Sequence, residues 1–193
     1  GVELLNNEKI FAYNLSDLYR RKGDTEKMIH YYLQSQMAQV QRINSAQNHF
    51  NRFLQNKDEY NILRAKLYEF LQEDPENIFF PEMIQWVFVQ NKDYLKALRQ
   101  AKALDLRLEE NGSRVFNMAQ IAYNDKDYDT ALAAYAYIIE NKGISNSYYI
   151  DSKKELLKTK RKQILLDPHH TQEGLLDLKA EYNHFLNEFG RDK

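Results

Sequence analysis

The sequence predicts an all-α fold of about ten helices, arranged as helix pairs that repeat along the chain. Three observations lead to this prediction. A short acidic signature returns with steps of 35, 34 and 34 residues between Asp24, Glu59, Asp93 and Asp127. Between these signatures, apolar residues recur at the three- and four-residue spacing of an amphipathic helix. The 193 residues include only 3 Pro and 6 Gly, which favours long helices joined by short turns.

The first helix pair shows the pattern most clearly. A helix is expected over residues 8–22, and Gly23-Asp24 should end it. Glycine tolerates positive φ at a helix C-terminus, and Asp24 or Thr25 can cap the next helix. The second helix of the pair is expected from Thr25 onward. Four of its residues should face back toward the first helix: Met28, Ile29, Tyr32 and Ser35.

The later pairs follow from the same reasoning. Helices are expected over residues 40–56 and 58–73, then 81–91 and 94–110, then 113–124 and 128–141. The pair over 40–56 and 58–73, the second of the chain, lacks small residues where the helices should approach closely, because Asn51 and Leu63 stand there. A last pair over 147–166 and 171–189 completes about ten helices with no strand. Its final helix carries an apolar stripe from Leu175 to Phe189.

The run Tyr13-Asn14-Leu15, Tyr19, Gly23-Asp24, Met28-Ile29 and Tyr31-Tyr32 resembles the consensus of the tetratricopeptide repeat (TPR). It departs mainly at Met28, where the family prefers Ala. The resemblance covers residues 8–143 and implies a right-handed α-α superhelix, a solenoid of stacked helix pairs. We therefore expect one domain over 1–193, divided into repeats at 8–39, 40–75, 78–111 and 112–143, with a terminal helical pair or elongated fifth repeat at 147–189.

The resemblance also implies where a partner would bind, because the first helix of each TPR lines a concave surface. The residues expected to bind a protein or peptide there are Tyr13, Asp17, Arg20, Asn48, Arg52, Trp86, Gln120 and Tyr123. Trp86, the only Trp, is either exposed as an interface residue or packed between neighbouring helices. One TPR subclass grips a peptide's terminal carboxylate through Asn on successive helices. Asp17, Arg52, Trp86 and Gln120 stand at those positions, so we expect no such clamp.

Composition and motifs argue against several other classes of protein. The 27 basic and 28 acidic residues leave a net charge of −1, which gives no reason to expect a nucleic-acid partner. There is no Cys, and hence no disulfide or thiolate chemistry. No apolar stretch is long enough for membrane insertion. We expect no enzyme activity, metal or cofactor, because the chain has no nucleophile elbow, phosphate loop or dinucleotide fingerprint.

Two charged features are expected to be solvated surface. His169-His170 lies in a predicted loop, and two adjacent His make a poor metal site because the ligands must converge on one ion. The basic run over residues 153–162 shares its helix with Asp151 and Glu155, which is typical of an exposed helix face. An enzyme would require a deep pocket that gathers titratable groups with strongly shifted pKa values.

The leading hypothesis is a non-enzymatic protein-interaction module. The alternative is a structural spacer or self-association segment, because Val2, Leu4, Leu5 and the stripe from Leu175 to Phe189 have no assigned partner within the repeats. The chain starts without Met, which favours a piece of a longer protein. Its many Asn, Gln, Lys and Tyr resemble long bacterial TPR proteins, some of them exported to the periplasm or cell envelope, and the compartment stays open.

Overall fold

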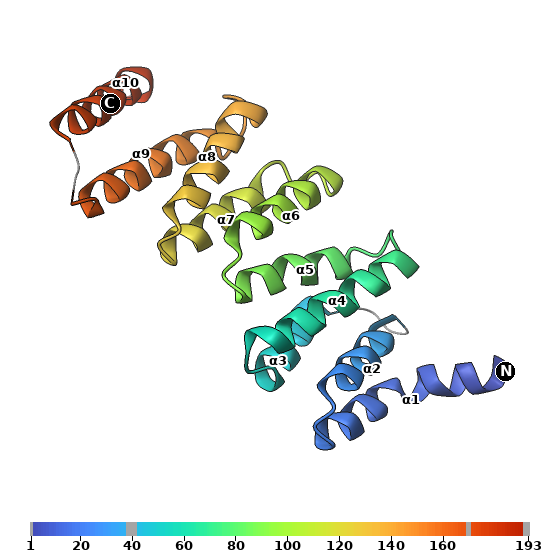
Figure 1. The fold of residues 1–193 in the computed structure, drawn as a ribbon. Helices are drawn as coiled ribbons and strands as arrows, with labels where there is room; N and C mark the ends of the chain where they lie inside the picture. Colours follow the sequence, from blue (N-terminus) through green and yellow to red (C-terminus); the bar gives the residue numbers. More distant parts are fainter. Residues whose placement is uncertain (1, 38–41, 169–170, 191–193) are drawn as a thin grey trace. The chain divides into compact units, whose positions relative to one another are not determined.

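The computed structural model describes residues 2–37, 42–168 and 171–190, with side chains from Phe11 onward. These residues form ten α-helices and no strand (Figure 1). The all-α class and the number of helices are therefore confirmed. The chain divides into two compact units, residues 1–93 and 94–193, and each is described by itself. The single solenoid over 1–193 and its internal repeat boundaries stay predictions.

The helix bounds follow the expected pattern with small differences. The first unit holds α1 (Val2–Arg21), α2 (Thr25–Met37), α3 (Ile43–Phe53), α4 (Lys57–Glu73) and α5 (Phe79–Gln90). The second holds α6 (Tyr94–Arg107), α7 (Ser113–Asn124), α8 (Tyr128–Lys142), α9 (Tyr149–Leu166) and α10 (Gln172–Phe189). The first helix begins earlier than expected, at Val2. Val40, the expected start of the third, lies outside the described residues.

Three of the four signature turns have the same backbone structure. Gly23, Lys92 and Lys126 adopt φ values of 73°, 60° and 68°. In each turn this residue's N–H donates to the carbonyl three residues back, and the following N–H donates to the carbonyl five residues back. This pair of bonds is the Schellman ending of a helix. The carboxylates of Asp24 and Asp127 then accept the N–H three residues on, at 3.0 and 3.1 Å. The recurring signature is thus a helix C-cap joined directly to an N-cap.

The second pair departs from this turn chemistry. The N-cap of α4 is Asn56, whose side chain accepts the N–H of Glu59 at 3.0 Å. Glu59 in turn accepts the N–H of Gln55, the residue before the cap, at 2.6 Å, an arrangement that resembles a capping box shifted by one residue. The residue equivalent to Asp24 is therefore Asn56 rather than Glu59. The spacing between caps is 32 residues (24 to 56) and then 37 (56 to 93), less regular than the acidic residues alone indicate.

The core of the first unit is an apolar layer between helices that are neighbours in space. α1 packs on α2, α2 on α4, and both α3 and α4 pack on α5. Large side chains fill the contacts between these helices. Leu63, for example, is fully buried where the repeat pattern predicts a small residue. The fully buried residues include Ile29, Leu33, Phe50, Leu63, Leu67, Phe80, Met83 and Ile84.

The second unit uses small residues at its close helix contacts. α6 packs on α7 and α8, α7 on α8, α8 on α9, and α9 on α10. Ala97, Ala101, Ala119, Ala122, Ala131 and Ala134 are all fully buried, and their small side chains let helices approach closely. The helix expected over 94–110 ends earlier, at Arg107. Glu109, Asn111 and Gly112 adopt positive φ, and the buried Asp105 carboxylate accepts the N–H of Gly112 at 2.7 Å.

Candidate functional site

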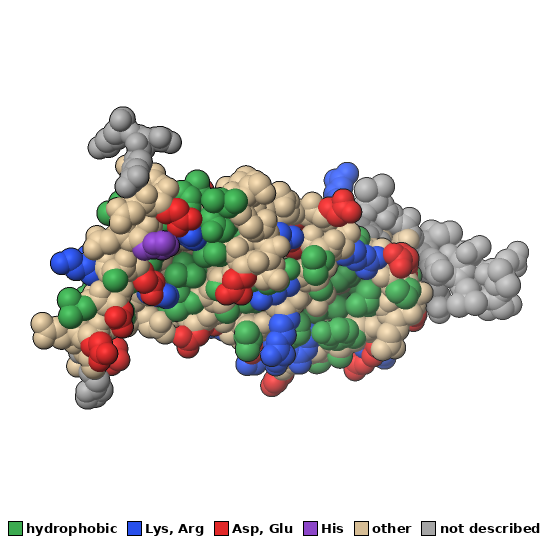
Figure 2. All heavy atoms as spheres, turned by 90° about the horizontal axis from the view of Figure 1, so that it is seen from above, with side chains coloured by type: hydrophobic (Ala, Val, Ile, Leu, Met, Phe, Trp, Pro, Cys, Tyr) green, Lys and Arg blue, Asp and Glu red, His purple; other side chains and the backbone are tan. Residues whose placement is uncertain are grey.

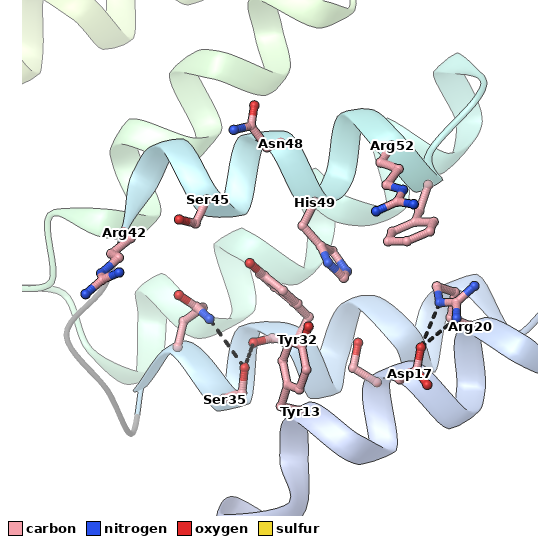
Figure 3. A pocket seen from close by; sticks show the side chains of 13 residues that line it. Tyr13, Asp17, Arg20, Tyr32, Ser35, Arg42, Ser45, Asn48, His49 and Arg52 are labelled. Carbon is pink, nitrogen blue, oxygen red and sulfur yellow. Dashed lines mark hydrogen bonds and ion pairs between the residues drawn. The ribbon is translucent and has the colours of Figure 1, made fainter.

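A groove of about 1020 Å³ lies in the first unit, with α3 on one side and α1 and α2 on the other (Figure 3). We call it the α1–α3 groove. It brings together five of the eight predicted site residues: Tyr13, Asp17, Arg20, Asn48 and Arg52. Its other lining residues are Ser16, Tyr32, Ser35, Gln36, Arg42, Ser45, His49 and Phe53. The lining is therefore mostly polar and aromatic.

The α1 side of the groove is fixed to α2 by one buried hydrogen bond. The hydroxyl of Ser16 donates to the carbonyl of Met28 at 2.9 Å. Tyr13 and Asp17 lie one turn apart on the same side of α1, because a helix repeats every 3.6 residues. Tyr13 is 57% exposed, so its ring and hydroxyl are open to a ligand.

Asp17 is the only carboxylate among the lining side chains that the structure describes, and it already has two partners. Its oxygens lie 2.6 Å from the Arg20 guanidinium and 2.7 Å from that of Arg21. The hydrogen bond from Arg20 lowers the pKa of Asp17. Arg20 is thereby held against α1 rather than extended into solvent.

Two guanidinium groups meet at one aromatic ring at the end of the groove. Arg20 lies 4.8 Å from the centre of the Phe53 ring and Arg52 lies 5.5 Å from it. Arg52 is exposed, and no carboxylate of the described residues forms an ion pair with it. At the opposite end lies Arg42 (Figure 3), which is also exposed.

The α3 side presents a polar stripe. Arg42, Ser45, His49 and Arg52 follow one another at intervals of three, four and three residues, which places them on one helix face. The sequence reasoning selected Asn48 and Arg52 but missed the other three. Their spacing was the available signal, although it does not by itself distinguish a ligand-binding face from a solvated one.

His49 lies in the groove with a polar atom that has no partner. Its ring stacks on Tyr32 with centroids 4.0 Å apart, and Phe53 lies 4.9 Å away. Its Nε2 is buried and makes no hydrogen bond. Burial lowers the pKa of His49 to about 4; the charges of Arg20 and Arg52 lower it further, and Asp17 opposes them. The imidazole is therefore neutral at pH 7.

Tyr32 and Ser35 supply the α2 side of the groove. Both are buried, and the Tyr32 ring lies between Tyr13 of α1 and His49 of α3. Burial raises the pKa of Tyr32 to about 12, so its hydroxyl stays protonated. The Ser35 hydroxyl donates to the Tyr32 carbonyl at 2.6 Å and accepts from the Gln36 amide at 3.4 Å. The structured floor of the groove is thus neutral.

The remaining predicted residues lie elsewhere. Trp86 on α5 packs edge-on against Tyr60 of α4, with centroids 5.7 Å apart, and it does not line the groove. Trp86 is half-buried, so its exposure lies between the two alternatives. Gln120 and Tyr123 belong to α7 in the second unit. There the Tyr123 ring lies 5.7 Å from that of Tyr128 and 5.1 Å from the Lys158 ammonium.

The basic run on α9 is partly neutralised within its own unit. Lys153 pairs with Glu188 at 2.8 Å, Lys158 with Glu155 at 2.8 Å, and Lys160 with Glu181 at 2.7 Å. Figure 2 likewise shows acidic and basic side chains interspersed on the face it presents. The pairs of Lys153 and Lys160 join α9 to α10, whereas Lys158 lies on an exposed face of α9.

The described residues contain neither a cluster of metal ligands nor a membrane-spanning helix. No three His, Cys, Asp or Glu of this part of the chain are grouped so that they could hold a metal ion. His169 and His170 lie outside it. No described helix combines the length and hydropathy required to cross a membrane.

Comparisons with known proteins identify no family for this chain. No family model matches the chain, and no curated protein matches it in sequence. Among solved structures, the crystal structure of MamA protein is similar, with a TM-score of 0.45 and 11% sequence identity over 97% of each chain. That likeness is too low to support any inference about this chain.

Proposed function

We propose that this chain is a protein-interaction module of the TPR type, and that the α1–α3 groove binds a segment of a partner protein. The observation that carries the proposal is the gathering of Tyr13, Asp17, Arg20, Asn48 and Arg52 around one open groove. Exposed aromatic, amide and guanidinium groups are the side chains that recognise polypeptides. They supply hydrogen bonds to a backbone together with contact area for apolar side chains.

The recurring structure of the turns between helices supports the proposal that the chain is of the TPR type. Three turns place a left-handed residue directly before an N-capping position, at the recurring signature from which the repeat was inferred. Rigid helices on each side of the groove would hold the binding residues in place without a ligand. Such preorganisation reduces the entropy lost when a peptide binds.

Peptide display on the purified chain tests this function. Peptides selected on the wild type should lose at least about tenfold in affinity for a Tyr13→Ala, Asn48→Ala variant, since an aromatic contact and an amide hydrogen bond each contribute about 1 kcal/mol. The matched control is Tyr68→Ala, Asn44→Ala, which removes the same residue types from exposed positions of the same unit outside the groove. Equal affinity for both variants would reject the groove as the site.

The alternative, a structural or self-associating segment, is favoured by one observation in the second unit. Leu165, Leu166, Leu176 and Leu186 on the last two helices are exposed, and exposed apolar side chains in groups favour association. A mass in light scattering that rises with protein concentration would support this alternative. A constant monomer mass would count against self-association.

A further inference from the structure

The α1–α3 groove carries its positive charge at its two ends and neutral hydrogen-bonding groups between them. Arg42 lies at one end, and Arg52 with Arg20 at the other (Figure 3). Between them lie Ser45, Asn48 and the neutral His49. Asp17, the one acidic residue among the lining side chains that the structure describes, is already bound to two guanidiniums. The groove therefore has unbalanced positive charge at two separate points.

We infer that the groove selects an extended acidic segment of a partner protein, with two side-chain carboxylates four to five residues apart. This inference rests on the proposed function and adds the chemistry of the partner. One carboxylate pairs with Arg42 and the other enters between Arg52 and Arg20, beside the Phe53 ring. The segment is an internal one, because it is the spacing of two side-chain charges that is recognised and not a chain end.

The spacing follows from helix geometry. Arg42 precedes the first residue of α3 and Arg52 lies in its last turn, ten residues further on. At about 1.5 Å per residue, the two backbone positions are roughly 15 Å apart along the axis. An extended peptide advances about 3.3 Å per residue. Two carboxylates four to five residues apart therefore match the two arginines, and adjacent carboxylates do not.

The middle of the groove suits a peptide backbone. The exposed Asn48 amide and Ser45 hydroxyl can each donate to a carbonyl and accept from an N–H. Tyr13, which is 57% exposed, adds an aromatic ring and a further polar group beside them.

A nucleic acid fits the groove less well. A single strand carries a phosphate at every nucleotide, and proteins bind it with basic groups that follow the whole backbone. Here the basic groups are confined to the two ends, and the interior donors and acceptors are uncharged. The chain's net charge of −1 also gives a polyanion no general attraction.

The experiment compares two randomised peptide libraries with blocked termini. One carries Glu at the first and the fifth or sixth positions, and the other carries Gln at the same positions. We expect enrichment from the Glu library only. The best peptide should bind about fivefold more weakly to Arg42→Gln and to Arg52→Gln, the loss expected for one exposed ion pair of about 1 kcal/mol, and at least about twentyfold more weakly to the double variant.

The controls separate this inference from the proposed function. The matched variant Arg99→Gln alters an exposed arginine of the second unit and should leave affinity unchanged. Enrichment from both libraries, with the binding lost in Tyr13→Ala, Asn48→Ala, would overturn the acidic specificity while keeping the peptide-binding groove. Enrichment from neither library would overturn both.

Two further measurements complete the test. Affinity for the selected peptide should fall as salt rises, because exposed charge pairs are screened, and affinity independent of salt would contradict the charge pairing. The last probe is a mixed-sequence single-stranded RNA. If this RNA binds through Arg42 and Arg52 and no peptide binds, the ligand of the groove is a nucleic acid and the inference is wrong. Both arginines are exposed, so their variants should fold, which circular dichroism verifies.

Discussion

The neutral His49 makes a quantitative prediction about how stability depends on pH. Its pKa in the folded protein is about 4, and in an unfolded chain it is about 6.5. Between these values the unfolded state binds a proton that the folded state excludes, so acidification stabilises the unfolded state. The contribution to stability is fully present above pH 6.5 and is lost as the pH falls toward 4.

The magnitude follows from the difference between the two pKa values. At pH 5 the unfolded imidazole is almost fully protonated and the folded one is almost fully neutral. With about 1.4 kcal/mol per pH unit, the wild type loses about 2 kcal/mol between pH 7.5 and pH 5 through this one residue. Burial against Tyr32 and Phe53 lowers the folded pKa of His49 the most, and the charges of Arg20 and Arg52 lower it further. The Asp17 carboxylate raises it.

The perturbation that isolates this term is His49→Phe, which keeps an aromatic ring against Tyr32 and cannot titrate. Urea unfolding of both proteins at pH 7.5 and pH 5 gives four free energies. The carboxylates shared by both proteins cancel in the comparison. We expect the advantage of the variant to grow by about 2 kcal/mol on acidification, whatever its value at pH 7.5.

Two results would refute the reasoning about His49. Stability curves that stay parallel from pH 7.5 to pH 5 would mean that the folded protein protonates His49 as readily as the unfolded chain does. An NMR titration of the imidazole that gives a folded pKa near 6.5 would show the same directly. His49→Gln serves as a second variant, because it removes the titration while retaining a polar side chain.

The remaining predictions concern the turns and one buried ion pair. Gly23→Ala should lower the free energy of unfolding by about 1 kcal/mol, because Gly23 has φ of 73° and an L side chain is strained there even with open space around it. The control is Gly174→Ala, in the first turn of α10 without positive φ. It should be neutral or stabilising in the same thermal unfolding assay. Asp105→Ala should cost about 3 kcal/mol, because it leaves the Lys142 ammonium, now 2.8 Å from the fully buried carboxylate, without its partner. Asp177→Ala on the exposed face of α10 should change urea stability by less than about 0.5 kcal/mol, and equal losses for the two aspartates would contradict the role given to Asp105.

The helices were predictable from the sequence because their signals are local. Apolar spacing and turn residues act within a few positions, so the ten elements and the break at Gly23-Asp24 could be read directly. The second pair shows the limit of this reasoning. The acidic residue at Glu59 kept the repeat spacing, yet Asn56 is the cap, because its side chain accepts the N–H of Glu59, which lies inside the first turn of α4.

The residues that line the groove were predictable only in part, for a different reason. A repeat alignment places Asn48 and Arg52 on a helix face, while Arg42, Ser45 and His49 on the same face were missed. Sequence gives the periodicity of a face but not what lies opposite it. Trp86 illustrates the same limit, because only the approach of α4 decided that its ring packs against Tyr60.

By itself, the sequence determined an all-α chain of ten helices joined by turns whose chemistry recurs, because these features depend on neighbours along the chain. The tertiary structure alone decided that Tyr13 and Arg20 of α1, Tyr32 of α2, and His49 and Arg52 of α3 share one groove. The residues that line it are up to 39 positions apart in the chain (13 to 52). Their arrangement depends on how side-chain volumes such as Leu63 and Phe50 space the helices, and that is a property of packing in three dimensions.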